Sequence, residues 1–213
     1  MTERDDVRYG VFLLPDARTS AAVTAITSCL RAQFGTVSAG RFPPHVTLAG
    51  SLPFADAETE LLTTIRAVAL EHEAVTLHNA GPRSLWRQVL AFDVHLDVTG
   101  VPNAALVNLA MAVVDAVRPL VHPAVGRAAD LRDRDTWHAH LSLASHDLAG
   151  RPELLHDVEV FVRDLHEPYP SEFEATRLGI FRLHHADWAG PWWTTFTWEF
   201  VTSIKLGADR SKK

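Results

Sequence analysis

Hydrophobic residues in the first part of the chain alternate between strand-like runs and helix-like stripes. The run Tyr9–Leu14 is apolar throughout and ends at Pro15, which is typical of a short strand buried on both faces. Over residues 16–34 apolar side chains recur every three or four positions, and Gly35 follows the last of them. This pattern predicts an amphipathic helix that ends with a glycine cap.

The same alternation continues to about residue 80. A strand is predicted over His45–Leu52, because two prolines precede it and disfavour helix. A helix follows, with Asp56 as its N-cap, glutamates in its first turn and its end near His72. Residues 74–80 then alternate apolar and polar side chains, so the first part reads strand, helix, strand, helix, strand.

The second part of the chain repeats this order, as an internal duplication would. The predicted elements are a strand over residues 90–98, a helix over 102–119, a strand beginning at His140, a helix from Pro152 to Leu165, and strands over 174–183 and 193–204. A loop over residues 122–136 separates two of them and carries arginines and aspartates, which favours a solvated surface loop over a substrate clamp.

The duplication predicts two pseudo-symmetric lobes within a single domain of residues 1–213. We place lobe one at about residues 8–82, lobe two at about residues 88–206, and a flexible tail at residues 207–213. In each lobe the middle strand carries a histidine, so a twofold arrangement would bring the two histidines face to face across a central cleft.

Two short motifs carry the candidate chemistry. Motif 1 is His-Val-Thr-Leu at residues 45–48, and motif 2 is His-Leu-Ser-Leu at residues 140–143. Successive side chains of a strand point to opposite faces, so the histidine and the hydroxyl residue of each motif share a polar face above an apolar one. A single His-x-Thr or His-x-Ser is weak evidence, but the pair in matching contexts indicates a functional site.

The paired motifs predict acid–base chemistry on a phosphodiester. His45 and His140 supply two imidazoles, and one can accept a proton from water while the other protonates the departing oxygen. The hydroxyls of Thr47 and Ser142 are donors suited to the phosphoryl oxygens. The sequence does not assign which histidine is the acid and which the base, nor whether the product carries a 2′- or a 3′-phosphate.

Composition restricts the partners of such a site. Hydrophobic residues make up 47% and charged residues 22% of the chain, as in ordinary globular proteins, and the formal net charge is −6. This charge argues against duplex DNA as a ligand and favours a small nucleotide or an RNA terminus. Without a membrane-spanning run or a signal-peptide pattern, we expect a cytoplasmic monomer with no membrane partner. The lone Cys29 is not expected to be a nucleophile.

With both motifs in view, the chain resembles the 2H phosphoesterase superfamily, which includes bacterial 2′-5′ RNA ligase and cyclic phosphodiesterase proteins. The resemblance implies an α+β fold, with two lobes that are each an antiparallel sheet with outer helices around a central cleft carrying the motifs. It also implies a metal-independent enzyme without cofactors that opens 2′,3′-cyclic phosphates, with 2′-5′ RNA ligation as a side activity of some members. Ser142 replaces the commoner threonine and keeps the hydroxyl.

Two other functions stay open at this point. A nucleotide- or RNA-end-binding module could keep the cleft without turnover. A metal-dependent hydrolase could use His138 and His140 with one or more of His95, His184 and His185, although no carboxylate stands at ligand spacing in that strand.

Aromatic residues add candidate substrate contacts. Trp137 and His138 directly precede motif 2 and are such candidates. Trp188, Trp192 and Trp193 gather near an expected hairpin tip, where they could stack on a base or cover the sheet edge.

Overall fold

The computed structural model describes residues 7–53, 58–121, 131–165 and 168–207. Asp56, part of the loop over residues 122–136 and most of the expected tail lie outside the described residues. The helices are α1 (Ala17–Phe34), α2 (Glu58–Glu71), α3 (Ala104–Val117), α4 (His146–Ala149) and α5 (Leu155–Asp164), with 3₁₀ turns at Ala39–Arg41, Arg118–Leu120, Pro152–Leu154 and Trp192–Thr194. The strands are β1 (Val7–Leu14), β2 (Val46–Leu52), β3 (Val75–His78), β4 (Pro82–Leu85), β5 (Val89–Asp93), β6 (His140–Ala144), β7 (Glu172–Ala175), β8 (Arg177–His184) and β9 (Thr197–Lys205).

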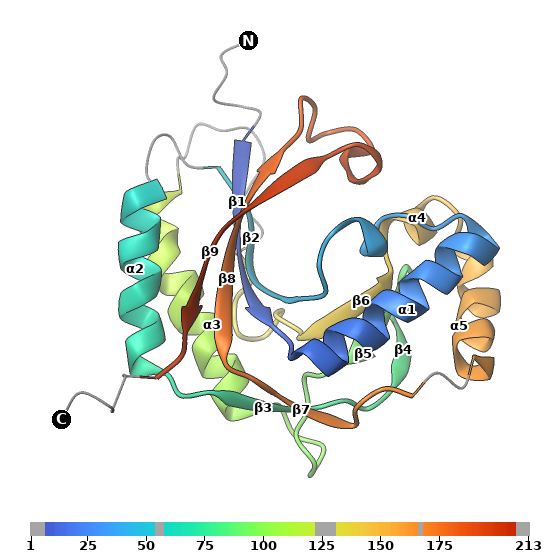
Figure 1. The fold of residues 1–213 in the computed structure, drawn as a ribbon, viewed down its shortest axis with the longest axis horizontal. Coiled ribbons are helices and arrows are strands. Elements are labelled where there is room, and N and C mark those ends of the chain that lie inside the picture. Colours follow the sequence, from blue (N-terminus) through green and yellow to red (C-terminus); the bar gives the residue numbers. More distant parts are fainter. Residues whose placement is uncertain (1–6, 54–57, 122–130, 166–167, 208–213) are drawn as a thin grey trace.

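The expected α+β class with antiparallel sheets is confirmed. A four-stranded sheet has the order β2-β1-β8-β9, a three-stranded sheet has the order β4-β5-β6, and β3 pairs with β7. Every pairing between these strands is antiparallel. Helices α2 and α3 lie beside the four-stranded sheet, whereas α1 and α5 lie beside the three-stranded one (Figure 1).

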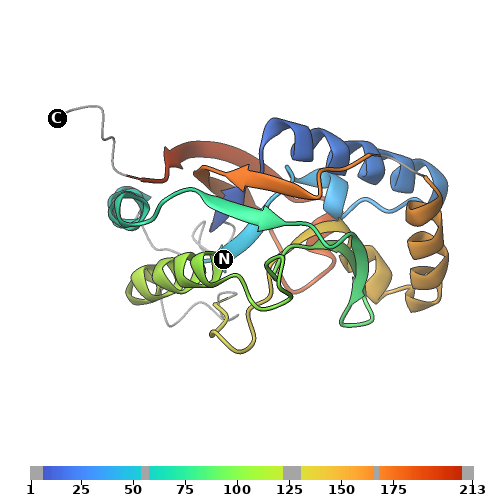
Figure 2. The same ribbon diagram turned by 90° about the horizontal axis from the view of Figure 1, so that it is seen from below.

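The lobes are not consecutive halves of the chain, so the predicted lobe boundaries are wrong. Strands β8 and β9, expected in lobe two, complete the sheet of β1, and α3 packs on α2 and β2. In exchange, α1 packs on β6, and α1 and α3 lie on opposite sides of the molecule (Figure 2). The physical reason is that β1 pairs along its full length with β8, a non-local pairing that a local hydrophobic pattern cannot report.

Both motif strands are edge strands of their sheets, although each was predicted as the middle strand of its half in chain order. Strand β2 ends the order of the four-stranded sheet, and β6 ends that of the three-stranded sheet. Residues of the two strands contact each other, so the sheets meet at these edges. This arrangement brings motif 1 and motif 2 together without the motifs sharing a sheet.

Several predicted boundaries also change. The strand expected over residues 90–98 ends at Asp93, because the chain turns into a loop that Asp97 stabilises through its carboxylate, which accepts from Thr99 N at 2.8 Å. The strand expected over residues 174–183 is two strands, β7 and β8, which pair with different partners. Strand β9 begins at Thr197 and not at Trp193, because residues 192–194 form a 3₁₀ turn. Strand β4 was not predicted.

Helix caps follow the sequence closely. The Asp16 carboxylate accepts from Thr19 N at 2.7 Å at the start of α1, and Gly35 ends this helix with a left-handed φ of 68°. The acids Glu58 and Glu60 occupy the first turn of α2, as predicted. Among the described residues no helix has both the length and the apolar character that crossing a bilayer requires.

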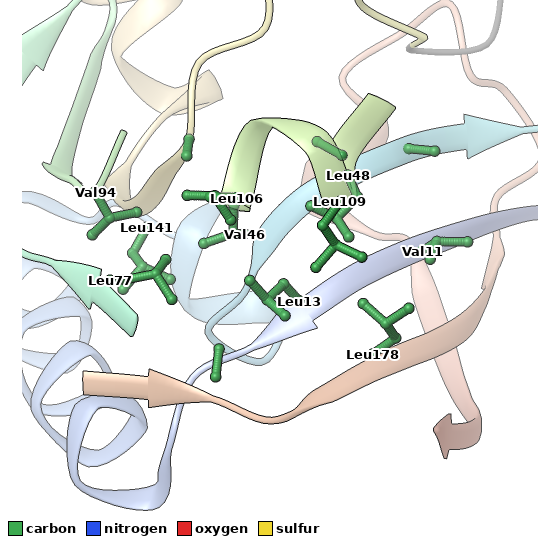
Figure 3. Close-up of a cluster of buried hydrophobic side chains, with 14 of the residues drawn as sticks. Val11, Leu13, Val46, Leu48, Leu77, Val94, Leu106, Leu109, Leu141 and Leu178 are labelled. Carbon is green, nitrogen blue, oxygen red and sulfur yellow. The ribbon is translucent and has the colours of Figure 1, made fainter. Parts of the chain in front are cut away.

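One hydrophobic cluster joins both sheets. Leu13 and Val46 from the four-stranded sheet belong to the same cluster as Leu141 of β6, and Leu106 and Leu109 of α3 pack against the motif 1 strand within it (Figure 3). All five side chains are at most 1% exposed. A second, smaller cluster around Phe12 and Phe181 lies on the four-stranded sheet. The single domain of residues 1–213 stays a prediction.

Candidate active site

Both motifs have the alternation that the sequence predicts. In motif 1 Val46 and Leu48 are 1% exposed, and in motif 2 Leu141 and Leu143 are 0% and 1% exposed. The histidine and hydroxyl residue of each motif are half-buried instead. The apolar side chains thus fix each strand in the core and turn the polar ones outward.

Backbone carbonyls orient both imidazoles. His45 Nδ1 lies 2.7 Å from Pro43 O, and His140 Nδ1 lies 2.9 Å from His138 O. A carbonyl can only accept, so each Nδ1 carries a proton. In the neutral form of each ring Nε2 is therefore the basic nitrogen, and the two histidines present it in the same way.

Aromatic rings surround His45. The imidazole packs edge-on against Phe12 and Phe42, with ring centroids 4.4 Å and 4.8 Å away. This burial lowers the pKa of His45 to about 4, the bond to Pro43 O opposes the shift, and the charge of His140 lowers the pKa further. The His140 imidazole thus lies near enough for its charge to disfavour protonation of His45.

Trp137 ties the two motif strands together. Its indole N–H donates to Thr47 O at 3.0 Å, although Trp137 precedes motif 2 and Thr47 belongs to motif 1. The side chain is 5% exposed. Its observed role is therefore to hold the two sheet edges in register, while a contact with substrate stays a prediction.

His138 belongs to a polar cluster that the sequence analysis did not assemble. Its Nε2 lies 3.1 Å from Asp93 Oδ1, and its ring stacks on His95 with centroids 4.4 Å apart. Asp93 is 3% exposed and pairs with His140 across β5 and β6. The Asp93 carboxylate keeps a lowered pKa in spite of burial, because His138 and the His95 N–H hydrogen-bond to it. The sequence feature that could have indicated this cluster is Asp93, an aspartate in an otherwise apolar strand.

A pocket of about 800 Å³ opens beside motif 2. Trp86 forms part of its wall and packs edge-on against His140, with ring centroids 5.2 Å apart. No turn-forming glycine or asparagine marks the hairpin tip at Trp86, which explains why the sequence did not indicate this residue. The residues around the pocket are Trp86, His95, Pro102, Ala104, Val107, Arg132, Arg134, Asp135, Thr136, Trp137 and His138.

Of the residues of the alternative metal site, His95 lies beside His138, but His184 and His185 do not join them. His184 ends β8 in the other sheet, beside Glu199, and His185 follows it, beside Trp188. Within the described ranges no group of three or more His, Cys, Asp or Glu residues could hold a metal ion. His138 is instead engaged by Asp93.

The tryptophans near residue 190 lie on the β8–β9 hairpin, as predicted. Trp188 is 8% exposed and packs on Trp192, with ring centroids 5.5 Å apart. Trp193 stacks on His146 of α4, which belongs to the other lobe. These contacts cover the end of the sheet and connect it to α4, which favours the covering role over base stacking.

Comparisons with known proteins agree with this geometry. Residues 14–187 match the family model described as the 2′-5′ RNA ligase superfamily. A search of curated proteins gives no match.

Solved structures share the fold. E. coli LigT complexed with 3′-AMP aligns with a TM-score of 0.51 at 18% identity, covering 95% of this chain and 99% of LigT. E. coli LigT complexed with NADP⁺ aligns with a TM-score of 0.53 at 16% identity, over 95% and 99% of the two chains. A crystal structure described as a phosphoesterase aligns with a TM-score of 0.51 at 16% identity, covering 95% of this chain and 99% of that chain. At these identities the likeness concerns the fold.

The family match covers most of the chain, and both motifs stand on adjoining sheet edges with their imidazoles oriented alike. The chain therefore belongs to the 2′-5′ RNA ligase superfamily, the 2H phosphoesterases.

Proposed function

We propose that this protein is a metal-independent phosphodiesterase that opens 2′,3′-cyclic phosphates of nucleotides or RNA ends by two-histidine acid–base catalysis. The observation that carries the proposal is geometric: the two motif strands meet at their sheet edges, and a backbone carbonyl holds Nδ1 of both His45 and His140. Family membership supports phosphoesterase activity, and LigT, a structural neighbour, has been crystallised with 3′-AMP.

The protonation states support a division of roles. With its pKa lowered to about 4, His45 is neutral at pH 7 and suited to accept the proton of the attacking water. His140 then protonates the ribose oxygen as the bond between that oxygen and phosphorus breaks. Water adds its oxygen to phosphorus, so the products are one free ribose hydroxyl and one phosphate monoester. The negative substrate raises the pKa of His45 in the complex, which makes it a stronger base there.

Thr47 and Ser142 complete the site in this proposal. Each lies two residues after a catalytic histidine, on the same face of its strand. Hydroxyl donors at these positions would meet the charge that develops on the phosphoryl oxygens. Because the two strands are tied by Trp137, the donors are held in place before substrate binds.

A pH series in excess chelator tests the proposal. Turnover of adenosine 2′,3′-cyclic phosphate, with the product identified by phosphorus NMR, should be unchanged by chelator and bell-shaped in pH. The acidic limb of kcat/KM reports the free protein, so its midpoint should lie well below the ordinary pKa of histidine. The acidic limb of kcat reports the complex, and its midpoint should lie at higher pH, since the bound phosphate raises the pKa of His45. Activity that is lost in chelator and restored by a divalent cation would overturn the proposal. Binding without turnover would favour a non-catalytic nucleotide-binding module.

A further inference from the structure

The pocket beside motif 2 lies outside the catalytic group. None of the two histidines and two hydroxyl residues of the motifs lines it, whereas their neighbours Trp137 and His138 do. Its volume of about 800 Å³ is in the range of sites that enclose small molecules, about 300–1,000 Å³. A phosphate held between His45 and His140 therefore leaves this pocket available for another part of the same ligand.

Trp86 is held in the pocket wall by a strained turn. Gln88 N donates to Leu85 O at 3.2 Å, and the two central residues, Trp86 and Arg87, have φ values of 51° and 59°. Hairpin turns with both central φ values positive normally use asparagine and glycine, because bulky side chains are strained there. Strain of this kind persists where surrounding structure or function maintains it.

The strained turn exposes a flat aromatic surface. Trp86 is 56% exposed, yet its ring packs edge-on against both His138 and His140, at 6.0 Å and 5.2 Å between centroids. The indole thus adjoins both His140 and the pocket, with much of its surface open to solvent. Bases of single-stranded nucleic acids stack on such surfaces.

The lining of the pocket also carries positive charge. Arg132 and Arg134 line the pocket together with one carboxylate, Asp135. The guanidinium of Arg134 donates to Asn108 Oδ1 at 2.9 Å, which fixes its position over α3. The loop itself is held by Asp133, whose carboxylate accepts from Thr136 N at 2.9 Å. Arginines at a fixed position are suited to a phosphodiester.

We propose that this pocket is a subsite for the nucleotide that adjoins the one carrying the reacting phosphate. Trp86 stacks on its base and Arg134 contacts its phosphate. The inference rests on the proposed function and narrows its substrate class. The preferred substrate is the end of an oligonucleotide, and a free cyclic mononucleotide is a poor one.

The first test compares two substrates that differ by one nucleotide. We expect kcat/KM for an adenosine dinucleotide ending in a 2′,3′-cyclic phosphate to exceed that for adenosine 2′,3′-cyclic phosphate by about tenfold or more. Trp86→Ala and Arg134→Ala should reduce this ratio toward one, and Trp86→Phe should restore most of it. Arg66→Ala, at an exposed position on α2, is the charge control and should leave the ratio unchanged. Equal kcat/KM for both substrates in the unmodified protein, or equal losses on both in Trp86→Ala, would overturn the subsite.

The second test measures binding without turnover. In the His45→Ala background, calorimetry should show that a linear adenosine dinucleotide 3′-phosphate binds about tenfold more tightly than 3′-AMP, and that Trp86→Ala removes the difference. If the dinucleotide binds more tightly and Trp86→Ala removes this preference, but the unmodified protein hydrolyses no cyclic phosphate, the proposed function fails and the subsite stands. If cyclic phosphates are hydrolysed but the two ligands bind equally, the subsite fails alone.

Discussion

His45 is the residue at which packing and chemistry meet. Phe12 and Phe42 remove water from its ring, and the same removal keeps the imidazole neutral at pH 7. Motif 1 is therefore more than a pair of polar groups on a strand, because its aromatic neighbours set the protonation state. Phe42 precedes the motif by three residues, but Phe12 comes from β1, and the sequence does not indicate that contact.

The lowered pKa of His45 predicts a pH dependence of stability. The unfolded chain binds a proton at this residue near pH 6.5 and the folded chain only near pH 4, so stability falls as the pH drops through this window. Urea unfolding measures this dependence. Between pH 7 and pH 5 the free energy of unfolding of His45→Gln should fall by about 1–2 kcal/mol less than that of the unmodified protein. His156→Gln, at an exposed position on α5, should follow the unmodified protein. Parallel curves for His45→Gln and the unmodified protein would show that His45 titrates normally.

The two hydroxyl residues should matter less than the histidines. Thr47→Val keeps the side-chain shape and Ser142→Ala removes only the hydroxyl, so each loses one of several hydrogen bonds to the phosphate. We expect kcat/KM to fall by about 10- to 100-fold in each, since a hydrogen bond to a charged group contributes about 1.5–3 kcal/mol. Steady-state kinetics on a cyclic nucleotide measures this, with Thr63→Val on α2 as the control. An unchanged kcat/KM in either variant would remove that hydroxyl from the site.

At the scale of elements, the site depends on two edge strands that share no ladder. A hydrogen bond from Trp137 to Thr47 O ties β2 to the segment that leads into β6. Asp147 of α4 adds a second tie nearby, because its carboxylate accepts from Val37 N and Ser38 N at 3.1 Å and 2.8 Å. The segment that leads into motif 1 is thus held by Asp147, which follows motif 2 in the chain.

Removing the indole donor should loosen the site. Trp137→Phe leaves Thr47 O without this donor, so we expect a loss of about 1–3 kcal/mol in the free energy of unfolding and a fall in kcat. Trp198→Phe is a matched control, because its indole donates to Arg41 O at 3.0 Å on a more exposed surface. Chemical denaturation and steady-state kinetics measure both effects. A Trp137→Phe protein with unchanged stability would contradict the role of this bond.

At the β4–β5 turn we expect glycine substitutions to raise stability, and the one at Trp86 to lower activity. Glycine adopts positive φ without strain, so Arg87→Gly should raise the free energy of unfolding by about 0.5–1 kcal/mol. Trp86→Gly should relieve similar strain while lowering turnover of an oligonucleotide cyclic phosphate. Thermal unfolding and kinetics on the same samples provide the comparison. If Trp86→Gly is both more stable and fully active, the strained turn has no role in the site.

At the scale of the whole molecule, local patterns predicted most helices and both motifs, whereas the antiparallel α+β class came from the resemblance to the 2H phosphoesterases. The hydrophobic alternation was sufficient because each motif strand anchors two aliphatic residues in the core. Lobe boundaries were wrong because the chain crosses between sheets, with β1 pairing to β8 and α1 packing on β6. Such pairings depend on contacts between residues far apart in the chain.

The site residues that the sequence analysis missed are brought together by such contacts between distant segments. Asp93 reaches His138 only because β5 and β6 pair, and Trp86 reaches His140 only because a turn without glycine points toward motif 2. Each of these residues looks ordinary in its local segment. Their roles follow from where the sheets meet.

The measurement that tests the central claim most directly is turnover of a 2′,3′-cyclic nucleotide in excess chelator by the unmodified protein, His45→Ala, His140→Ala and the double variant. We expect each single variant to lose about 10²- to 10⁴-fold in kcat, and the double variant to be little worse than the poorer single one, because the two imidazoles act as a unit. His156→Ala should keep full activity. A single variant that retains more than about a tenth of the turnover, or losses that multiply in the double variant, would contradict two-histidine catalysis.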